Sequence, residues 1–161
     1  MKKILIAFFL IVGGITVQAQ EKAEIKWMTL DEALQLQAKK PKKAKPIFMD
    51  VYTDWCGPCK MLDKNTFHDP EFVKFITENY YPVKFNGEGN SEVNHKGKKY
   101  TNPGYNPDRK GRNAVHDFTM FLQVQGYPSM YVLDTKGEVK PPLVGYRTAP
   151  ELITELKNMK L

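Results

Sequence analysis

The stretch DWCGPCK, Asp54 to Lys60, contains both cysteines of the 161-residue chain, Cys56 and Cys59. Only two residues separate them, so a disulfide between them would close a very small loop. The chain entropy that a disulfide removes grows with the length of the closed loop, so this pair would stabilise a fold very little. The spacing therefore favours redox chemistry over a structural cross-link.

The residues on either side predict a strand that leads into a helix. Residues 47–52 form an apolar run typical of a buried central strand, with one carboxylate, Asp50, inside it. Pro58 suits the first turn of a helix, where its missing N–H costs nothing. At a helix N-terminus, unpaired N–H groups and the helix dipole stabilise the thiolate of the more exposed cysteine. We expect Cys56 to be this nucleophile, and Cys59, one turn further along, to resolve the mixed disulfide.

The rest of the chain alternates between helix and strand signals. Two capping boxes, in which a threonine and a glutamate three residues later cap each other's backbone, open predicted helices at Thr29 and Thr148. Asp69 followed by Pro70 marks another helix start. The predicted elements are an edge strand at 25–28, a helix at 29–39, a loop at 41–46, a helix from 69, a strand at 82–86, a helix at 113–124 capped by Asn113, strands at 129–133 and near 139–144, and a last helix from 148.

Residues 87–112 change in character and predict an insertion loop rich in glycine, asparagine and lysine. The loop has an excess of basic over acidic side chains, with Tyr100 and Tyr105 between them. A partner-docking arm reaching beside the cysteines is one interpretation. A solvated surface loop is the commoner fate of such composition and is favoured. His95 and His116 are interpreted as ordinary surface or helix residues.

Residues 1–19 predict a cleaved signal peptide. Lys2 and Lys3 precede an apolar run from Ile4 to Val12, and a small residue, Ala19, marks the expected cleavage site. The uncharged run is shorter than the roughly 18 residues of a spanning helix, so a retained anchor is the less favoured alternative. We therefore expect a periplasmic or secreted protein whose residues 20–161 form one domain.

The formal charge of +6 falls to +4 when the two lysines of this segment are removed. A weak, dispersed positive charge does not indicate nucleic-acid binding, which needs a concentrated basic surface. A structural zinc site is disfavoured because a second C-x-x-C is absent from the sequence and the histidines are scattered. We expect no metal and no cofactor beyond the redox-active Cys56–Cys59 disulfide.

The motif resembles that of the thioredoxin family, W-C-G-P-C-K, which Trp55, Gly57 and Pro58 complete around the two cysteines. The resemblance covers about Pro46 to Leu161 and implies an α/β thioredoxin-like fold. This fold has a central mixed β-sheet flanked by helices, here with an inserted loop before the third helix. Four further positions match the family in order: Asp50, a buried carboxylate that takes the proton of the resolving thiol; Lys84, a lysine near it; Pro128, the cis-proline that faces the dithiol; and Gly145, which keeps the substrate groove open.

The resemblance also implies how the site works. The backbone of Tyr127, before the cis-proline, would pair with an extended substrate. The Gly57-Pro58 dipeptide adds no charge or imidazole to stabilise the thiolate, whereas family oxidants and isomerases typically have a histidine there. A less stabilised reduced form is a better reductant. The run from Asp50 to Phe72 is most similar to the subgroup that includes the C-terminal domain of membrane electron-relay thiol:disulfide interchange proteins.

We therefore expect a monomeric, exported protein-disulfide reductase. Its partners would be disulfide-bearing exported proteins and a membrane thiol electron donor, with no nucleic acid. The alternative is a redox-switched binding or chaperone-like module that uses the same fold without turnover.

Overall fold

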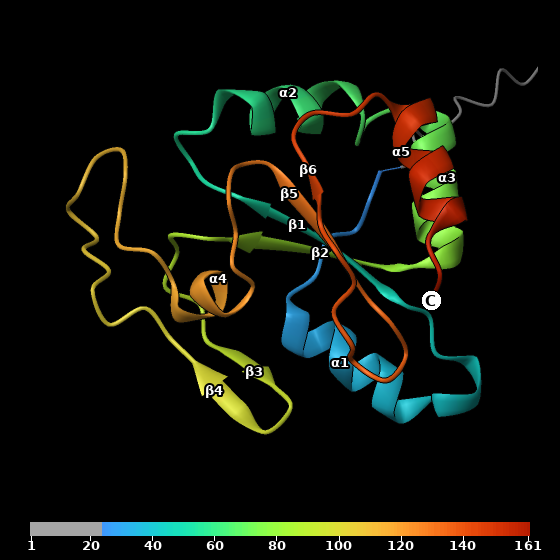
Figure 1. Cartoon of the computed structure of the whole chain (residues 1–161), viewed down its shortest axis with the longest axis horizontal. Helices are drawn as coiled ribbons and strands as arrows, with labels where there is room; N and C mark the ends of the chain where they lie inside the picture. The colour runs from blue at the N-terminus through green and yellow to red at the C-terminus, as the bar shows by residue number, and fades with distance from the viewer. Residues whose placement is uncertain (1–23) are drawn as a thin grey trace, which may run out of the picture.

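The structure is a computed structural model that describes residues 24–161, so the predicted signal peptide lies outside the described residues. Its centre is a four-stranded mixed sheet in the order β2-β1-β5-β6 (Figure 1). Strand β1 (Ile47–Tyr52) runs parallel to β2 (Tyr81–Asn86) and antiparallel to β5 (Ser129–Leu133). Strand β6 (Leu143–Val144) pairs antiparallel with β5 at the edge. The predicted α/β fold with a mixed sheet is confirmed.

Helices cover both faces of this sheet (Figure 1). One face carries α2 (Gly57–Asn65), α3 (Pro70–Asn79) and α5 (Ala149–Asn158). The other carries α1 (Leu30–Lys39) and the short α4 (Asp117–Phe121), and a 3-10 turn, η1 (Pro41–Lys43), follows α1. Within residues 24–161, no helix is long and apolar enough to cross a membrane.

Side-chain alternation along β1 divides its residues between two hydrophobic cores. Phe48 packs with the α2, α3 and α5 face, whereas Ile47, Met49 and Val51 pack with the α1 and α4 face. Successive side chains of a strand point to opposite faces, so Asp50 shares the face of Phe48. The strand thereby directs a carboxylate towards the helix that carries the cysteines.

Helix starts follow the predicted caps. Thr29 and Glu32 form the capping box of α1, and the Asp69 carboxylate accepts hydrogen bonds from the first turn of α3. Thr148 donates both its N–H and its hydroxyl to Glu151 at the start of α5. These three starts are confirmed because a cap depends on residues within one turn of each other.

Three other segments differ from the expectation. The predicted edge strand at 25–28 is reduced to a single bridge between Met28 and Val83, and the predicted 41–46 loop contains η1. The predicted 139–144 strand is an isolated bridge at Val139 followed by the two residues of β6. Two prolines, Pro141 and Pro142, stand between that bridge and β6 and cannot donate ladder hydrogen bonds.

The prediction of a helix at 113–124 is wrong in its start and length. Helix α4 begins only after His116, whose Nδ1 accepts a hydrogen bond from the Phe118 N–H at 3.0 Å. Asn113 instead accepts from the N–H groups of Asn106 and Ala114, so it fastens the insertion. Asn113, the predicted cap, therefore does not cap α4.

The expectation of a solvated loop at 87–112 is also wrong in part. The segment contains a hairpin of β3 (Val93–His95) and β4 (Lys98–Tyr100), which forms its own two-stranded sheet. Val93 and Tyr100 are buried in the core beside Phe118. His95 is buried in β3 and His116 is the buried N-cap of α4, so the interpretation as surface residues is wrong for both, and only His116 belongs to a helix end. Only the tip of the insertion matches the solvated description.

Candidate redox site

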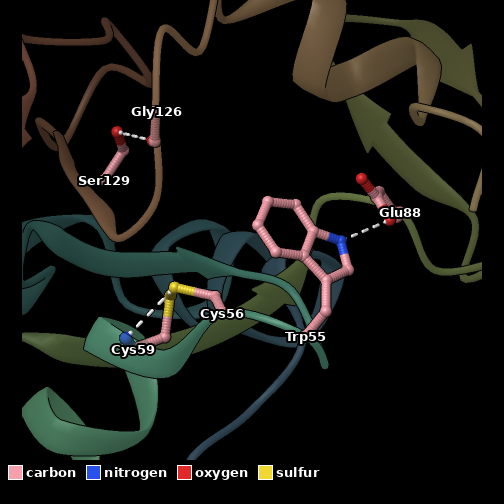
Figure 2. The surroundings of a disulfide bond; sticks show 6 residues. All are labelled: Trp55, Cys56, Cys59, Glu88, Gly126 and Ser129. Atoms are coloured by element: carbon pink, nitrogen blue, oxygen red, sulfur yellow. Dashed lines mark hydrogen bonds between the residues drawn. A yellow bond between two sulfur atoms is a disulfide. The ribbon is translucent and has the colours of Figure 1, made fainter. Parts of the chain in front are cut away.

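Cys56 and Cys59 form a disulfide at the N-terminus of α2. Their Cα atoms are 5.3 Å apart, and the Cys59 N–H lies 3.1 Å from the Cys56 sulfur (Figure 2). Cys56 is the N-cap of the helix, and Gly57 and Pro58 are its first two residues. The predicted position at a helix N-terminus is confirmed. Cys56 is 2% exposed and Cys59 5%, so Cys56 is not the more exposed cysteine in this disulfide form.

Asp50 lies in a cavity of about 220 Å³ that Cys59 also lines. Its carboxyl group is buried, and its Oδ1 has no hydrogen-bond partner within residues 24–161. Burial raises the pKa of Asp50 to about 7, opposed by the positive charge of Lys84 and reinforced by the negative charge of Asp63. A carboxyl group with this pKa can both take and release a proton near neutral pH.

Lys84 stands opposite Asp50 in the β1–β2 register, but its ammonium group pairs with Asp63. Lys84 therefore acts on Asp50 through its charge, without a salt bridge between them. Asp63 was not among the residues expected from sequence. Its spacing of four residues after Cys59 is the signal that could have found it, because residues four apart share one face of a helix.

The three residues expected to bind substrate lie next to each other at one end of β5 and β6, with Tyr127 and Pro128 just before β5 and Gly145 just after β6. The Tyr127–Pro128 bond is cis, and the Pro128 carbonyl accepts a hydrogen bond of 2.8 Å from the Gly145 N–H. Gly145 has φ +91°, a conformation that favours glycine. No hydrogen bond within residues 24–161 engages the backbone N–H or C=O of Tyr127. Figure 2 shows the chain from Gly126 to Ser129 passing beside the disulfide, where Ser129 Oγ donates to the Gly126 carbonyl.

The insertion reaches the redox site through Trp55. The indole Nε1 of Trp55 donates to Glu88 Oε2 at 2.8 Å (Figure 2), and the Asn113 N–H donates to the same oxygen at 2.7 Å. The Arg112 guanidinium lies 4.1 Å from the centroid of the Trp55 ring. The rings of Trp55 and Tyr127 are perpendicular to each other, with their centroids 5.8 Å apart. The sequence carries no local signal for these contacts, because 33 residues separate Trp55 from Glu88.

Within the described part of the chain, no three His, Cys, Asp or Glu side chains gather as a possible metal site. Asp50, Asp63 and Lys84 line one cavity with Cys59, whose disulfide with Cys56 lies at a helix N-terminus. A dithiol in that place can exchange electron pairs with another disulfide. The fold and this pair define the class of thiol–disulfide oxidoreductases.

The chain belongs to the thioredoxin-like domain family, which matches residues 31–160. In this family the disulfide itself is the redox group. A stretch of 59 residues is 44% identical to thiol:disulfide interchange protein DsbD of Citrobacter koseri, covering 37% of this chain and 10% of that protein. The chain thus matches about a tenth of the length of this curated relative.

Solved structures agree with the family. A candidate disulphide isomerase from Bacteroides thetaiotaomicron is 25% identical with a TM-score of 0.57, and the match covers 85% of this chain and 93% of that one. The oxidised C-terminal domain of Neisseria meningitidis DsbD is 19% identical with a TM-score of 0.50, covering 81% and 97%. At 19% identity, the similarity to the Neisseria meningitidis domain supports the fold alone.

Proposed function

We propose that this protein is an exported protein-disulfide reductase, which reduces disulfides in other exported proteins and is re-reduced by a membrane thiol donor. The observation that carries the proposal is the Cys56–Cys59 pair at the start of α2, with the buried Asp50 in the cavity that Cys59 lines. The printed name of the DsbD relatives, thiol:disulfide interchange protein, supports the same chemistry. Export is supported by the sequence of residues 1–19.

The proposed reaction begins with the reduced protein. The Cys56 thiolate attacks one sulfur of the substrate disulfide, that S–S bond breaks, and the other substrate sulfur leaves as a thiolate and takes up a proton. Asp50 then accepts the proton of Cys59, and the Cys59 thiolate attacks the Cys56 sulfur. The second substrate thiol is released, and the protein ends as the disulfide seen here. Two electrons pass from the protein to the substrate.

The proposed substrate is an extended segment that lies against the Tyr127 backbone. The free N–H and C=O of Tyr127 can pair with the backbone of such a segment. Gly145 lies beside this position through its bond to Pro128, and it adds no side chain to the groove. In this proposal Lys84 adjusts the charge balance around Asp50 without touching substrate.

The direction of electron flow is inferred from the residues between the cysteines. Gly57 and Pro58 place no charged or imidazole group beside Cys56, so the reduced form gains little extra stabilisation. Equilibration of the mature protein with defined thiol buffers, followed by alkylation of free cysteines, measures the reduction potential. We expect a value near about −270 mV, the range of thioredoxin, and a value near about −120 mV would reverse the proposed direction.

A second experiment separates turnover from simple binding. Replacing the resolving cysteine, Cys59→Ser, should trap substrates as mixed disulfides on Cys56, because the second exchange step can no longer occur. The double variant Cys56→Ser with Cys59→Ser is the matched control and should trap nothing. A partner retained equally by the double variant would favour the binding-module alternative and contradict the reductase.

A further inference from the structure

A groove of about 720 Å³ lies on the α4 side of Trp55, next to the redox site. Trp55 and Tyr127 line one part of it, and Arg112, Val115 and Met120 line another. Trp55 directly precedes Cys56, and Tyr127 directly precedes Pro128. Figure 2 shows Trp55 between the disulfide and Glu88. A polypeptide that reacts at Cys56 can therefore extend into this groove.

The buried carboxylate of Glu88 holds two sides of the groove together. Its Oε2 accepts hydrogen bonds from both the Trp55 indole N–H and the Asn113 backbone N–H. Asn113 follows Arg112, so the same contact keeps Arg112 over the Trp55 ring. The insertion thus forms one wall of the groove.

Arg112 is the basic side chain that lines the groove, which the buried Glu88 also lines, and Arg109 and Lys110 precede Arg112 in the insertion. Within residues 24–161, no carboxylate forms an ion pair with Arg109, Lys110 or Arg112, all of which are exposed. The hairpin lysines differ, because Lys96 pairs with Glu138 and Lys99 with Glu92. A guanidinium stacked on an aromatic face keeps its N–H edge available for a carboxylate.

Beside Arg112 the lining includes two apolar side chains that are open to solvent, together with the polar Thr119, Gln123 and Gln125. Met120 is 57% exposed and Val115 46%, and both line the groove that Trp55, the neighbour of Cys56, also lines. Such side chains can cover the aliphatic part of a bound residue, while Arg112 binds its acidic end. An acidic side chain with an aliphatic stem matches both features.

We propose that the Trp55–Arg112 groove recognises a glutamate or aspartate that flanks the disulfide cysteine of the substrate protein. This inference rests on the proposed function and specifies its substrate class. Arg112 is the specificity residue: it binds the carboxylate, holds the flanking segment in the groove and so raises the rate of attack by Cys56.

The test compares two synthetic disulfide peptides that are identical except for Glu or Gln beside the attacked cysteine. The reduced protein is mixed with each peptide, the reaction is quenched with acid, and the second-order rate constants are obtained by chromatography. We expect the native protein to reduce the Glu peptide about threefold to tenfold faster than the Gln peptide, because the Arg112 guanidinium over the Trp55 ring makes stronger hydrogen bonds to a carboxylate than to a neutral amide. Arg112→Gln should bring the ratio of the two rates close to one.

Lys136→Gln is the matched control, because it removes one exposed positive charge in the turn after β5, at the far end of that strand from the redox site. It should keep the ratio of the native protein. Equal rates for both peptides with the native protein, or an unchanged ratio in Arg112→Gln, would overturn the inference while leaving the reductase in place. If the native protein reduces neither peptide, the proposed function fails and the inference fails with it.

Discussion

Asp50 shows how the position of one residue sets both its chemistry and its effect on stability. Its pKa is about 7 in the folded protein against an ordinary value of 3.8, chiefly because burial disfavours the charged form. The folded state therefore binds more protons than the unfolded state between these two pH values, and stability falls as pH rises through this window. Below about pH 3.8 the Asp50 carboxyl is protonated in both states, so its burial does not lower the free energy of unfolding. Above about pH 7 the carboxyl is charged in both states, and the full loss of stability is present.

Asp50→Asn should accordingly stabilise the oxidised protein, and by more at pH 8 than at pH 5. The raised pKa of Asp50 lowers the free energy of unfolding by roughly 4 kcal/mol at pH 8 and by about 1.5 kcal/mol at pH 5. We expect the free energy of unfolding to rise by about 2 to 4 kcal/mol at pH 8. Urea denaturation with the disulfide intact measures both values.

Asp108→Asn provides the comparison, because Asp108 is an exposed acid on the insertion. It should change the free energy of unfolding by little at either pH. A gain for Asp50→Asn that is the same at pH 5 and pH 8 would show that the Asp50 carboxyl does not titrate in this window.

At the scale of elements, the insertion depends on tertiary contacts at both of its ends. Its hairpin is buried through Val93 and Tyr100, and its return segment is fastened by the Glu88 carboxylate. The tip between these points carries Arg109, Lys110 and Arg112. Glu88 therefore couples the order of the insertion to the position of Trp55.

Glu88→Ala should release the tip of the insertion while the sheet stays folded. Two hydrogen bonds to a buried carboxylate are lost, each with a contribution of about 1.5 to 3 kcal/mol, and two N–H groups lose their acceptor. We expect trypsin to cleave after Arg109, Lys110 or Arg112 about tenfold faster, because local opening requires less free energy. Mass spectrometry of the fragments over time measures the rates.

Glu92→Ala is the control for this experiment. It removes a carboxylate from the same insertion, but that carboxylate only pairs with Lys99 at the exposed surface. Exposed pairs contribute little, so cleavage should stay near the native rate. Equal acceleration in both variants would mean that Glu88 has no special role in anchoring the insertion.

At the scale of the whole molecule, two hydrophobic cores on opposite faces of one sheet form the folded body from residue 24 onward. The preceding segment has the charge pattern of an export signal, and the small Ala19 marks its predicted end. We expect the exported protein to begin at Gln20.

The intact mass of protein recovered from the periplasm of an expression host tests this prediction. The mass should correspond to residues 20–161, and Ala19→Asp should block processing because the cleavage site requires a small residue. A periplasmic protein that retains residues 1–19 would contradict it.

Features that depend on neighbours along the chain could be predicted from the residues alone. The cap at Thr29, the Asp69-Pro70 start of α3 and the strand β1 were predicted because each involves residues within a few positions of one another. For the same reason, the sequence correctly predicted the cysteine pair at the start of α2 and Asp50 inside a buried strand.

Contacts between residues far apart in the chain follow from the packing of whole elements. Lys84 was expected near Asp50, yet its ammonium pairs with Asp63, because the packing of α2 against the sheet brings that carboxylate into reach. The contact of Glu88 with Trp55, and the placement of Arg112 over that ring, likewise join segments far apart in sequence. Propensities and caps act over one turn or one strand, whereas these contacts depend on how whole elements pack, so no local pattern encodes them.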